Sequence, residues 1–334
     1  AAAPPPRVPP CARRAVAAMS ETAKLWDPTQ DFELKKKLGE GSFGAVYMGV
    51  ARGTTEEFAI KRLAVSDQKA LDAILKEIDL MKTVVCDHVT KYYANYFWNK
   101  QIWIVMEFCH MGSLSDVLDR FEKIDPPRGF REETRIASAA LGTLRGLSYM
   151  HARNIVHRDI KSDNILINKH GAVKLADFGI SRKISEHESR MHTMIGTPHY
   201  LAPEVLRAEA GHGYTAKVDI WAFGTVCLEM ADGKPPYAHL GPIKVLFELS
   251  NNPKIGLKQP ERWSSQFVTF TQICCVADPN ERASTDQVLA HPFLASTRPQ
   301  LDLTMPTPSV GADIGADLHV PGGQTRNGGG GGGG

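Results

Sequence analysis

Hydrophobic and polar positions in the first part of the chain follow a strand-like pattern that is broken by turn residues. Residues 32–50 and 58–63 predict short strands around turns, and residues 92–97 and 101–108 predict a strand pair bent around residues 98–100. Between these strands, residues 70–82 carry apolar side chains at helical spacing. The single apolar stripe of this helix indicates that it packs against a sheet.

After Gly112 the apolar positions are spaced as in helices. The predicted helices cover residues 114–121, 134–152, 218–231, 266–276 and 285–289. A small sheet-rich lobe over about residues 32–109 and a larger helical lobe over about residues 110–295 predict an α+β protein with two lobes. This order places a cleft near residues 106–113, and ligands commonly bind in such clefts.

Both ends of the chain differ from the middle in composition. Residues 1–25 are mostly Ala- and Pro-rich, and residues 296–334 become Gly- and Pro-rich, so both are expected to be disordered extensions of a folded domain at 26–295. The first twenty residues also have the composition of an organelle transit peptide. We favour the disordered extension, and the alternative of a targeting segment stays open.

Composition excludes several classes of protein. Lys plus Arg is 39 and Asp plus Glu is 37, and this balance argues against a protein that coats nucleic acid or a membrane surface. The six cysteines form no CxxC pair, which indicates reduced thiols and a cytoplasmic location. No apolar run approaches the length that spans a bilayer.

A glycine-rich loop is the first motif that suggests chemistry. Residues 38–46 read LGEGSFGAV, and glycines at this spacing allow backbone amides to close over phosphate oxygens. A strand follows the loop, which argues against a Rossmann unit. A simple hairpin turn remains the alternative for this motif alone. The residues expected at the phosphates are Gly39, Gly41, Ser42 and Gly44.

One lysine lies on a predicted strand among apolar neighbours. Lys61 ends the sequence FAIK, and Glu77 lies on the flank of the helical stripe that follows. If that helix packs on the sheet, Glu77 is placed to pair with Lys61 and hold it against the α- and β-phosphates. A solvent-exposed lysine without a role is the alternative.

The segment HRDIKSDN at residues 157–164, followed after a short hairpin by DFG at residues 177–179, carries the strongest signal. Phosphoryl transfer needs an oriented hydroxyl, metal ions on the phosphates and positive charge near the transferred group. Asp159 is placed to accept the hydroxyl proton, and Lys161 to neutralise the γ-phosphoryl charge. Asn164 and Asp177 supply oxygen ligands of the kind that Mg²⁺ prefers.

These residues together resemble the eukaryotic protein kinase superfamily over about residues 32–295. The resemblance extends to APE at residues 202–204, to DIW at residues 219–221, and to Arg282. It implies the bilobal protein kinase fold, ATP and Mg²⁺ as cofactors, an Asp219 that braces the catalytic loop, and an Arg282–Glu204 pair.

The same resemblance implies where adenine is held. Met106 takes the gatekeeper position, and the backbones of Glu107 and Cys109 are expected to bind the adenine edge. The apolar side chains expected around the ring are Leu38, Val46, Ala59 and Leu166.

In more detail, the sequence is similar to the sterile-twenty group of protein kinases, in particular to its Hippo (mammalian sterile-twenty-like) kinases. The segments that carry this similarity are residues 91–93, 102–109, 112–116, 233–237 and 261–264. Residues 198–201 read PHYL, where the group usually has Phe-Trp-Met after the proline. The resemblance implies protein substrates and a place in a signalling cascade.

Acceptor choice and regulation are also implied by the resemblance. Lys161 and Thr197 mark Ser or Thr as the acceptor, and Thr197 is expected to bond Asp159 and Lys161. The β-branched Ile180 after DFG favours threonine. Arg158 beside Asp159 is expected to pair with a phosphate on Thr193, added by an upstream kinase or by trans-autophosphorylation.

Two hypotheses from different classes remain open beside an active protein kinase. One is a pseudokinase, a kinase-shaped scaffold without turnover, which usually lacks one of Lys61, Asp159, Asn164 and Asp177; all four are present. The other is a kinase for a small metabolite. The long segment from residue 177 to residue 204, against which protein substrates dock in the family, favours protein substrates.

Overall fold

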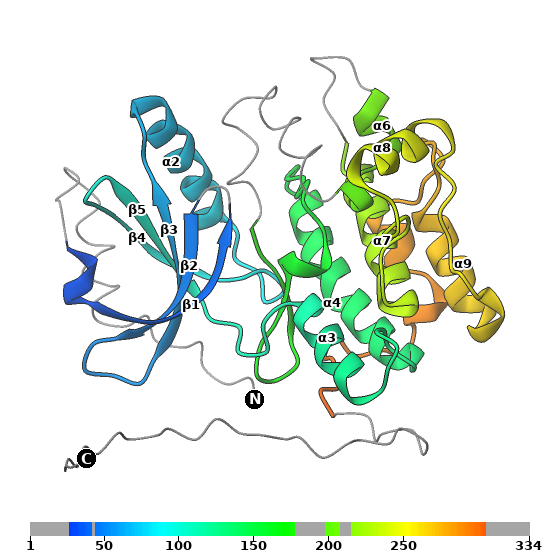
Figure 1. The fold of residues 1–334 in the computed structure, drawn as a ribbon, viewed down its shortest axis with the longest axis horizontal. Helices are drawn as coiled ribbons and strands as arrows, with labels where there is room; N and C mark the ends of the chain where they lie inside the picture. Colours follow the sequence, from blue (N-terminus) through cyan, green and yellow to red (C-terminus); the bar gives the residue numbers. More distant parts are fainter. Residues whose placement is uncertain (1–26, 42–43, 178–197, 208–214, 305–334) are drawn as a thin grey trace, which may run out of the picture.

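The computed structural model of the chain describes residues 27–41, 44–177, 198–207 and 215–304. These residues form a sheet-rich N-terminal lobe and a larger, mainly helical C-terminal lobe, which lie side by side in Figure 1. The predicted α+β fold with two lobes is confirmed. None of the helices in these ranges combines the length and apolarity needed to cross a bilayer.

The N-terminal lobe is built on a five-stranded antiparallel sheet in the order β1-β2-β3-β5-β4. Its strands are β1 (Phe32–Gly41), β2 (Gly44–Ala51), β3 (Glu57–Ala64), β4 (Tyr92–Trp98) and β5 (Gln101–Glu107). The β4–β5 connection lies at the predicted bend of residues 98–100. Trp98 still belongs to β4, and the turn itself is Asn99 and Lys100, with φ values of 49° and 56°.

Helix α2 (Gln68–Thr83) covers one face of this sheet (Figure 1). It begins at Asp67, whose side chain accepts a hydrogen bond of 2.8 Å from the Ala70 amide. Ile74, Ile78 and Met81 of its apolar stripe are buried in the core between helix and sheet. The predicted helix and its orientation are therefore confirmed.

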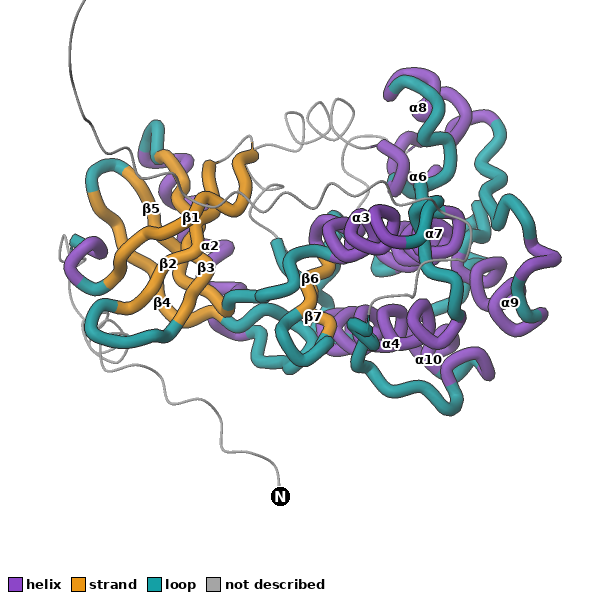
Figure 2. The backbone as a smooth tube through the Cα atoms, turned by 60° about the horizontal axis from the view of Figure 1, so that its bottom comes forward, coloured by secondary structure: helices purple, strands orange, loops and turns teal. Residues whose placement is uncertain are grey.

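The C-terminal lobe packs helices around α4 and α7 (Figure 2). The helices predicted from the sequence are α3 (Leu114–Ile124), α4 (Glu133–His151), α7 (Lys217–Asp232), α9 (Ser265–Cys274) and α10 (Thr285–Leu289). Short 3-10 turns occur at η2 (Pro28–Gln30), η3 (Ser162–Asn164), η4 (Pro198–Tyr200), η5 (Pro260–Arg262) and η6 (Pro292–Leu294).

Sequence reasoning missed two helices of this lobe. Helix α6 (Pro203–Arg207) is too short to show a helical period. Helix α8 (Pro242–Asn251) carries apolar residues on opposite sides, so its pattern has no single stripe.

A short hairpin of β6 (Ile165–Ile167) and β7 (Val173–Leu175) connects the two main motifs of the sequence. It packs closely on α4, because a Cβ on Gly142 of that helix would lie 2.7 Å from the Cβ of Val173. Hydrogen bonds from Met111 to Ile167 (3.0 Å) and from Ile167 to Gly112 (2.9 Å) join the hairpin to the connection between the lobes. The hairpin is therefore fixed between α4 and the connection between the lobes.

The folded chain continues past the expected end at residue 295, which corrects that boundary. Residues 299–304, here called the C-terminal strap, lie against the β6–β7 turn: the Leu301 amide donates to the Gly171 carbonyl (2.8 Å), and the Leu301 side chain is 3% exposed. Gly171 has φ 77°, and a Cβ there would lie 2.2 Å from the Leu301 carbonyl oxygen. The composition of this stretch hid the boundary, because Leu301 and Leu303 are the residues of the strap that pack on the hydrophobic core.

Candidate active site

The sheet register places the predicted adenine contacts and the predicted phosphate-binding lysine on one face. Lys61 pairs with Val46 across β2–β3, and Ala59 pairs with Met106 across β3–β5. Because side chains alternate along a strand, all four point to the same side of the sheet. Ala59 and Met106 are buried, whereas Leu38 on β1 is 43% exposed.

The β1–β2 turn requires glycine at one of its predicted positions. Gly44 has φ 149°, and a Cβ there would lie 1.9 Å from the Arg62 carbonyl oxygen. Gly39 and Gly41 end the paired part of β1. Ser42 lies outside the described residues.

The connection between the lobes contains the two predicted backbone contacts of adenine. The Cys109 amide makes no hydrogen bond with another residue of the described ranges. Burial raises the pKa of the Cys109 thiol to about 12, so the thiol is protonated at neutral pH. Glu107 directs its side chain away from solvent, where its Oε2 accepts from the Lys91 amide at 3.3 Å.

A buried lysine that sequence reasoning missed supports this connection. The Lys174 ammonium lies 2.9 Å from Glu107 Oε2 and donates to the Asp87 carbonyl at 3.0 Å. The Lys174 side chain is 5% exposed, although it lies on a strand with apolar neighbours. The sequence signal that could have identified this buried lysine is its position as the single charged residue of the short apolar strand β7.

Three predicted catalytic-loop side chains meet in the structure. Asn164 donates from Nδ2 to both the carbonyl oxygen (2.8 Å) and the carboxylate (2.7 Å) of Asp159. The Lys161 ammonium lies 3.3 Å from the same carboxylate. Asp159 is thus held by an amide and an ammonium group.

Buried Asp219 fixes the backbone of this loop. It accepts hydrogen bonds from the amides of His157 (2.8 Å) and Arg158 (2.7 Å) and contacts His151 Nε2 at 2.9 Å. These bonds hold Arg158 at φ 67°, a conformation that non-glycine residues rarely adopt. Asp219 therefore makes the bracing contact that the kinase resemblance implies.

Lys61 has a different partner from the one expected. Its ammonium lies 2.7 Å from Asp177 Oδ1. Among the described residues Lys61 forms its ion pair with Asp177, and the expected ion pair with Glu77 is not formed. Glu77 lies on α2 and is 3% exposed. Burial alone would raise the pKa of Asp177, but the positive charge of Lys61 and its hydrogen bond lower it below the ordinary value. Asp177 is therefore ionised at neutral pH.

The two halves of the site are joined by backbone hydrogen bonds. The Ala176 amide, next to Asp177, donates to the Asn164 carbonyl at 2.9 Å, and the Ala176 carbonyl contacts His157 Nε2 at 3.0 Å. These bonds bring the metal-ligand candidates Asn164 and Asp177 to one end of the β6–β7 hairpin. Leu166 lies on β6 and is half-buried.

The donor set fits Mg²⁺. Because Asn164 uses its amide nitrogen to bind Asp159, its amide oxygen is the atom left for a cation. Asp177 is ionised, and its side chain is 41% exposed, so a carboxylate oxygen is accessible. Two protein oxygens completed by phosphates and water are the arrangement that Mg²⁺ adopts with nucleotides.

Arg282 and Glu204 form the pair that the kinase resemblance implies. Nη1 and Nη2 of Arg282 lie 2.7 and 2.9 Å from the two carboxylate oxygens of Glu204. The guanidinium also lies over the Trp221 ring at 5.1 Å. This bidentate pair anchors α6 to the C-terminal lobe.

Three further predicted residues, Ile180, Thr193 and Thr197, lie outside the described residues. Within them, the structure brings together Lys61 with Asp177, and Asp159 with Lys161 and Asn164. The side chain of Arg158 is exposed.

A family model described as "Protein kinase domain" matches residues 32–294. The match covers every described element from β1 to η6, and it includes all of the site residues above.

Proposed function

This chain belongs to the protein kinase domain family, and from that premise we propose that it transfers the γ-phosphoryl group of ATP to serine and threonine hydroxyls of proteins, with threonine preferred. The observation that carries the proposal is the contact of Asp159 with both Lys161 and Asn164, beside the Lys61–Asp177 pair. These five groups are the ones that phosphoryl transfer requires.

The proposed step needs one base and two cations from the protein. The acceptor hydroxyl oxygen attacks the γ-phosphorus, the bond from phosphorus to the β–γ bridging oxygen breaks, and ADP leaves. The hydroxyl proton passes to the Asp159 carboxylate. Lys161 neutralises the transferred group, and Lys61 orients the α- and β-phosphates.

Asn164 and Asp177 are the residues that would hold Mg²⁺, which would supply positive charge to neutralise the phosphates. For Asp177 to take this role, Lys61 must leave its carboxylate and bind phosphate instead. Glu77 on α2 is the residue that we expect to hold Lys61 in that state.

Three residues outside the described ranges support the proposed acceptor and regulation. Ile180 supports threonine, because its branched side chain leaves room for the extra methyl group. Thr197 supports a Ser/Thr acceptor through hydrogen bonds to Asp159 and Lys161. Thr193 is proposed as the activating phosphorylation site, with Arg158 as the partner of its phosphate.

The finer assignment follows from the motifs. We place the chain in the sterile-twenty group, in its Hippo branch, on the segments at residues 91–93, 102–109 and 112–116. That placement supports a role in a cytoplasmic signalling cascade.

A degenerate peptide array with radiolabelled ATP tests the activity. Each array peptide is made in a Ser and a Thr version, and kcat/KM is then measured on the best matched pair. We expect threonine to be favoured about 10- to 200-fold, the range that one methyl group in an apolar contact gives. The Ile180→Phe variant should move the ratio toward serine, and equal rates in the wild type would contradict the acceptor assignment.

The same array separates the active kinase from the scaffold. A pseudokinase binds ATP or partners without labelling any peptide. Four intact residues, Lys61, Asp159, Asn164 and Asp177, favour turnover. Absence of label on every peptide, from enzyme with a phosphorylated Thr193, would favour the scaffold.

A further inference from the structure

Helix α8 presents two apolar sides, and the described residues bury only one of them. Val245 and Leu249 are fully buried in the cluster that contains Leu201 and Trp221. Ile243 and Phe247, one helical turn apart, are 83% and 66% exposed. Single exposed apolar residues need no explanation, but two large ones at i and i+4 form a contiguous surface, here called the α8 patch.

The α8 patch lies beside the part of the C-terminal lobe that leads into the acceptor site. Helix α8 contacts η4 and α6, and η4 directly follows the segment that ends at Thr197. Figure 1 shows α8 beside α6 on the outer side of α7. A protein held on α8 is therefore bound next to η4, which follows in sequence the segment that we propose binds the phosphoacceptor.

The C-terminal end of α8 is held in place by a strained residue. Tyr237 has φ 61°, which is unfavourable for a residue with a side chain. Its hydroxyl donates to the carbonyls of Asn252 (3.2 Å) and Lys254 (3.1 Å), the residues that follow the helix. A preformed surface of this kind loses less entropy when it binds a partner.

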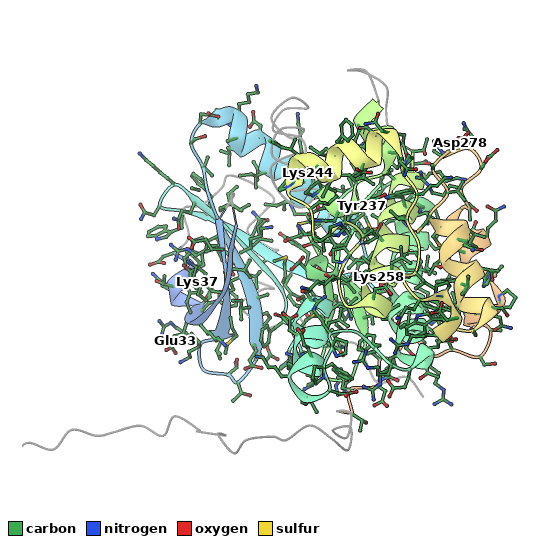
Figure 3. The ribbon with its side chains drawn as sticks, turned by 45° about the vertical axis from the view of Figure 1, so that its right-hand side comes forward. Glu33, Lys37, Tyr237, Lys244, Lys258 and Asp278 are labelled. Atoms are coloured by element: carbon green, nitrogen blue, oxygen red, sulfur yellow. The ribbon has the colours of Figure 1, made fainter. Side chains whose placement is uncertain are left out.

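The surroundings of the α8 patch are positively charged. Exposed Lys244 lies on α8 itself and exposed Lys254 follows the end of the helix, and neither forms an ion pair with another described residue. Figure 3 shows Lys244 on α8, with Tyr237 just below it. The acid on the helix itself is Glu248, which is half-buried.

We propose that the α8 patch docks a segment of the protein substrate that carries two large apolar residues flanked by Asp or Glu. The apolar residues cover Ile243 and Phe247, and the acids face the surrounding lysines, so that charge complementarity selects the partner. The docking segment lies apart from the phosphoacceptor in the substrate chain. This inference rests on the proposed kinase function.

Tethered peptides test the docking surface. One peptide carries only a threonine acceptor, and a second carries the same acceptor joined by a Gly-Ser linker to a segment with Leu and Phe four residues apart between glutamates. A third replaces these glutamates by lysines. With the full chain as enzyme, we expect a KM at least about tenfold lower for the second peptide than for the first, because the tether raises the effective acceptor concentration, and no such gain for the third.

Two variants assign the effect to the patch. The double substitution Ile243→Asp and Phe247→Asp should remove the gain and leave kcat/KM on the short peptide within about twofold, since both residues are exposed and outside the active site. Val85→Asp is the matched control, because Val85 is 76% exposed in the other lobe and should keep the gain. Lys244→Glu should shift the preference toward the lysine-flanked peptide.

Three outcomes would overturn the inference. One is an equal KM for the tethered and untethered acceptors in the wild type, and another is a gain that survives the double substitution. A dimer in light scattering that the double variant dissolves would assign the patch to a second copy of the chain. If no peptide is phosphorylated, the proposed function fails by itself, and fluorescence anisotropy of the labelled docking segment still decides whether α8 binds it.

Discussion

The Lys61 ammonium lies 2.7 Å from the Asp177 carboxylate, so the two groups proposed for phosphate and for Mg²⁺ neutralise each other in this state. The Lys61 side chain is 13% exposed and the Asp177 side chain 41% exposed, which leaves the pair open to solvent on one side. The proposed reaction requires each group to exchange its partner for nucleotide or metal. The ion pair is therefore a resting arrangement of the site.

Lys61→Met should lower kcat/KM at least about a hundredfold, which corresponds to about 2.7 kcal/mol of transition-state stabilisation. The change keeps the apolar stem and removes the charge that orients the phosphates. The Tm should stay nearly unchanged, because the Asp177 side chain is 41% exposed and water can replace the lost ammonium contact. Lys35→Met, at an exposed lysine of β1, is the control. Activity within tenfold of wild type at an unchanged Tm would contradict the assignment.

Thr193→Ala should prevent activation. A phosphate on Thr193 carries nearly two negative charges and is expected to pair with the exposed Arg158 beside Asp159. Phosphatase treatment of the wild type should lower kcat to the level of the variant, and ATP incubation should restore the wild type alone. Full activity after phosphatase treatment would refute this regulation.

Arg282→Ala should destabilise the C-terminal lobe by about 3–5 kcal/mol, because it leaves the Glu204 carboxylate without its buried partner. Arg282 is 1% exposed and makes both hydrogen bonds to that carboxylate. Urea unfolding measures the loss, and Arg262→Ala, at an exposed arginine, should change stability by less than about 0.5 kcal/mol. In a double-mutant cycle, Glu204→Gln should recover part of the loss; strictly additive effects would show that the pair is not coupled.

Leu301→Ala should destabilise the protein by about 2–5 kcal/mol, the usual cost of removing a buried leucine side chain. Gly171→Ala should also destabilise it, since its Cβ would meet the Leu301 carbonyl. Thermal and urea unfolding of both variants check these values, with Arg298→Ala as an exposed control. A neutral Leu301→Ala would show that the C-terminal strap contributes no packing energy.

Stability should fall as the pH drops below about 6.5, partly through His157. Burial lowers the pKa of His157 below its ordinary value, although nearby Asp219 and Asp159 oppose this shift. The unfolded chain then binds more protons than the folded one between the unfolded and folded pKa values, so the free energy of unfolding rises with pH across that window. Urea unfolding from pH 5 to 8 should show this slope, and His157→Gln should reduce it. An unchanged slope in the variant would exclude His157 as the cause.

Local pattern was sufficient for most of the fold. Helix α2 and the β4–β5 hairpin could be predicted because their signals lie within a few residues: an apolar stripe in one case and a two-residue turn in the other. Helix α8 could not be predicted, because it carries apolar residues both on the side that packs on the core and on the side that is exposed to solvent. A period cannot appear where both sides of a helix carry apolar residues.

The sequence by itself determined which groups are available for chemistry, because Asp159, Lys161 and Asn164 lie within one short motif that can bring them together through local backbone geometry alone. Tertiary structure decided the partners that lie far apart in the chain. Lys61 meets Asp177 across 116 residues, Lys174 is buried against Glu107, and Leu301 closes on Gly171. Such contacts depend on which surfaces meet when the lobes pack. The local sequence around a lysine or leucine is the same whether its side chain is buried in a contact or exposed to water.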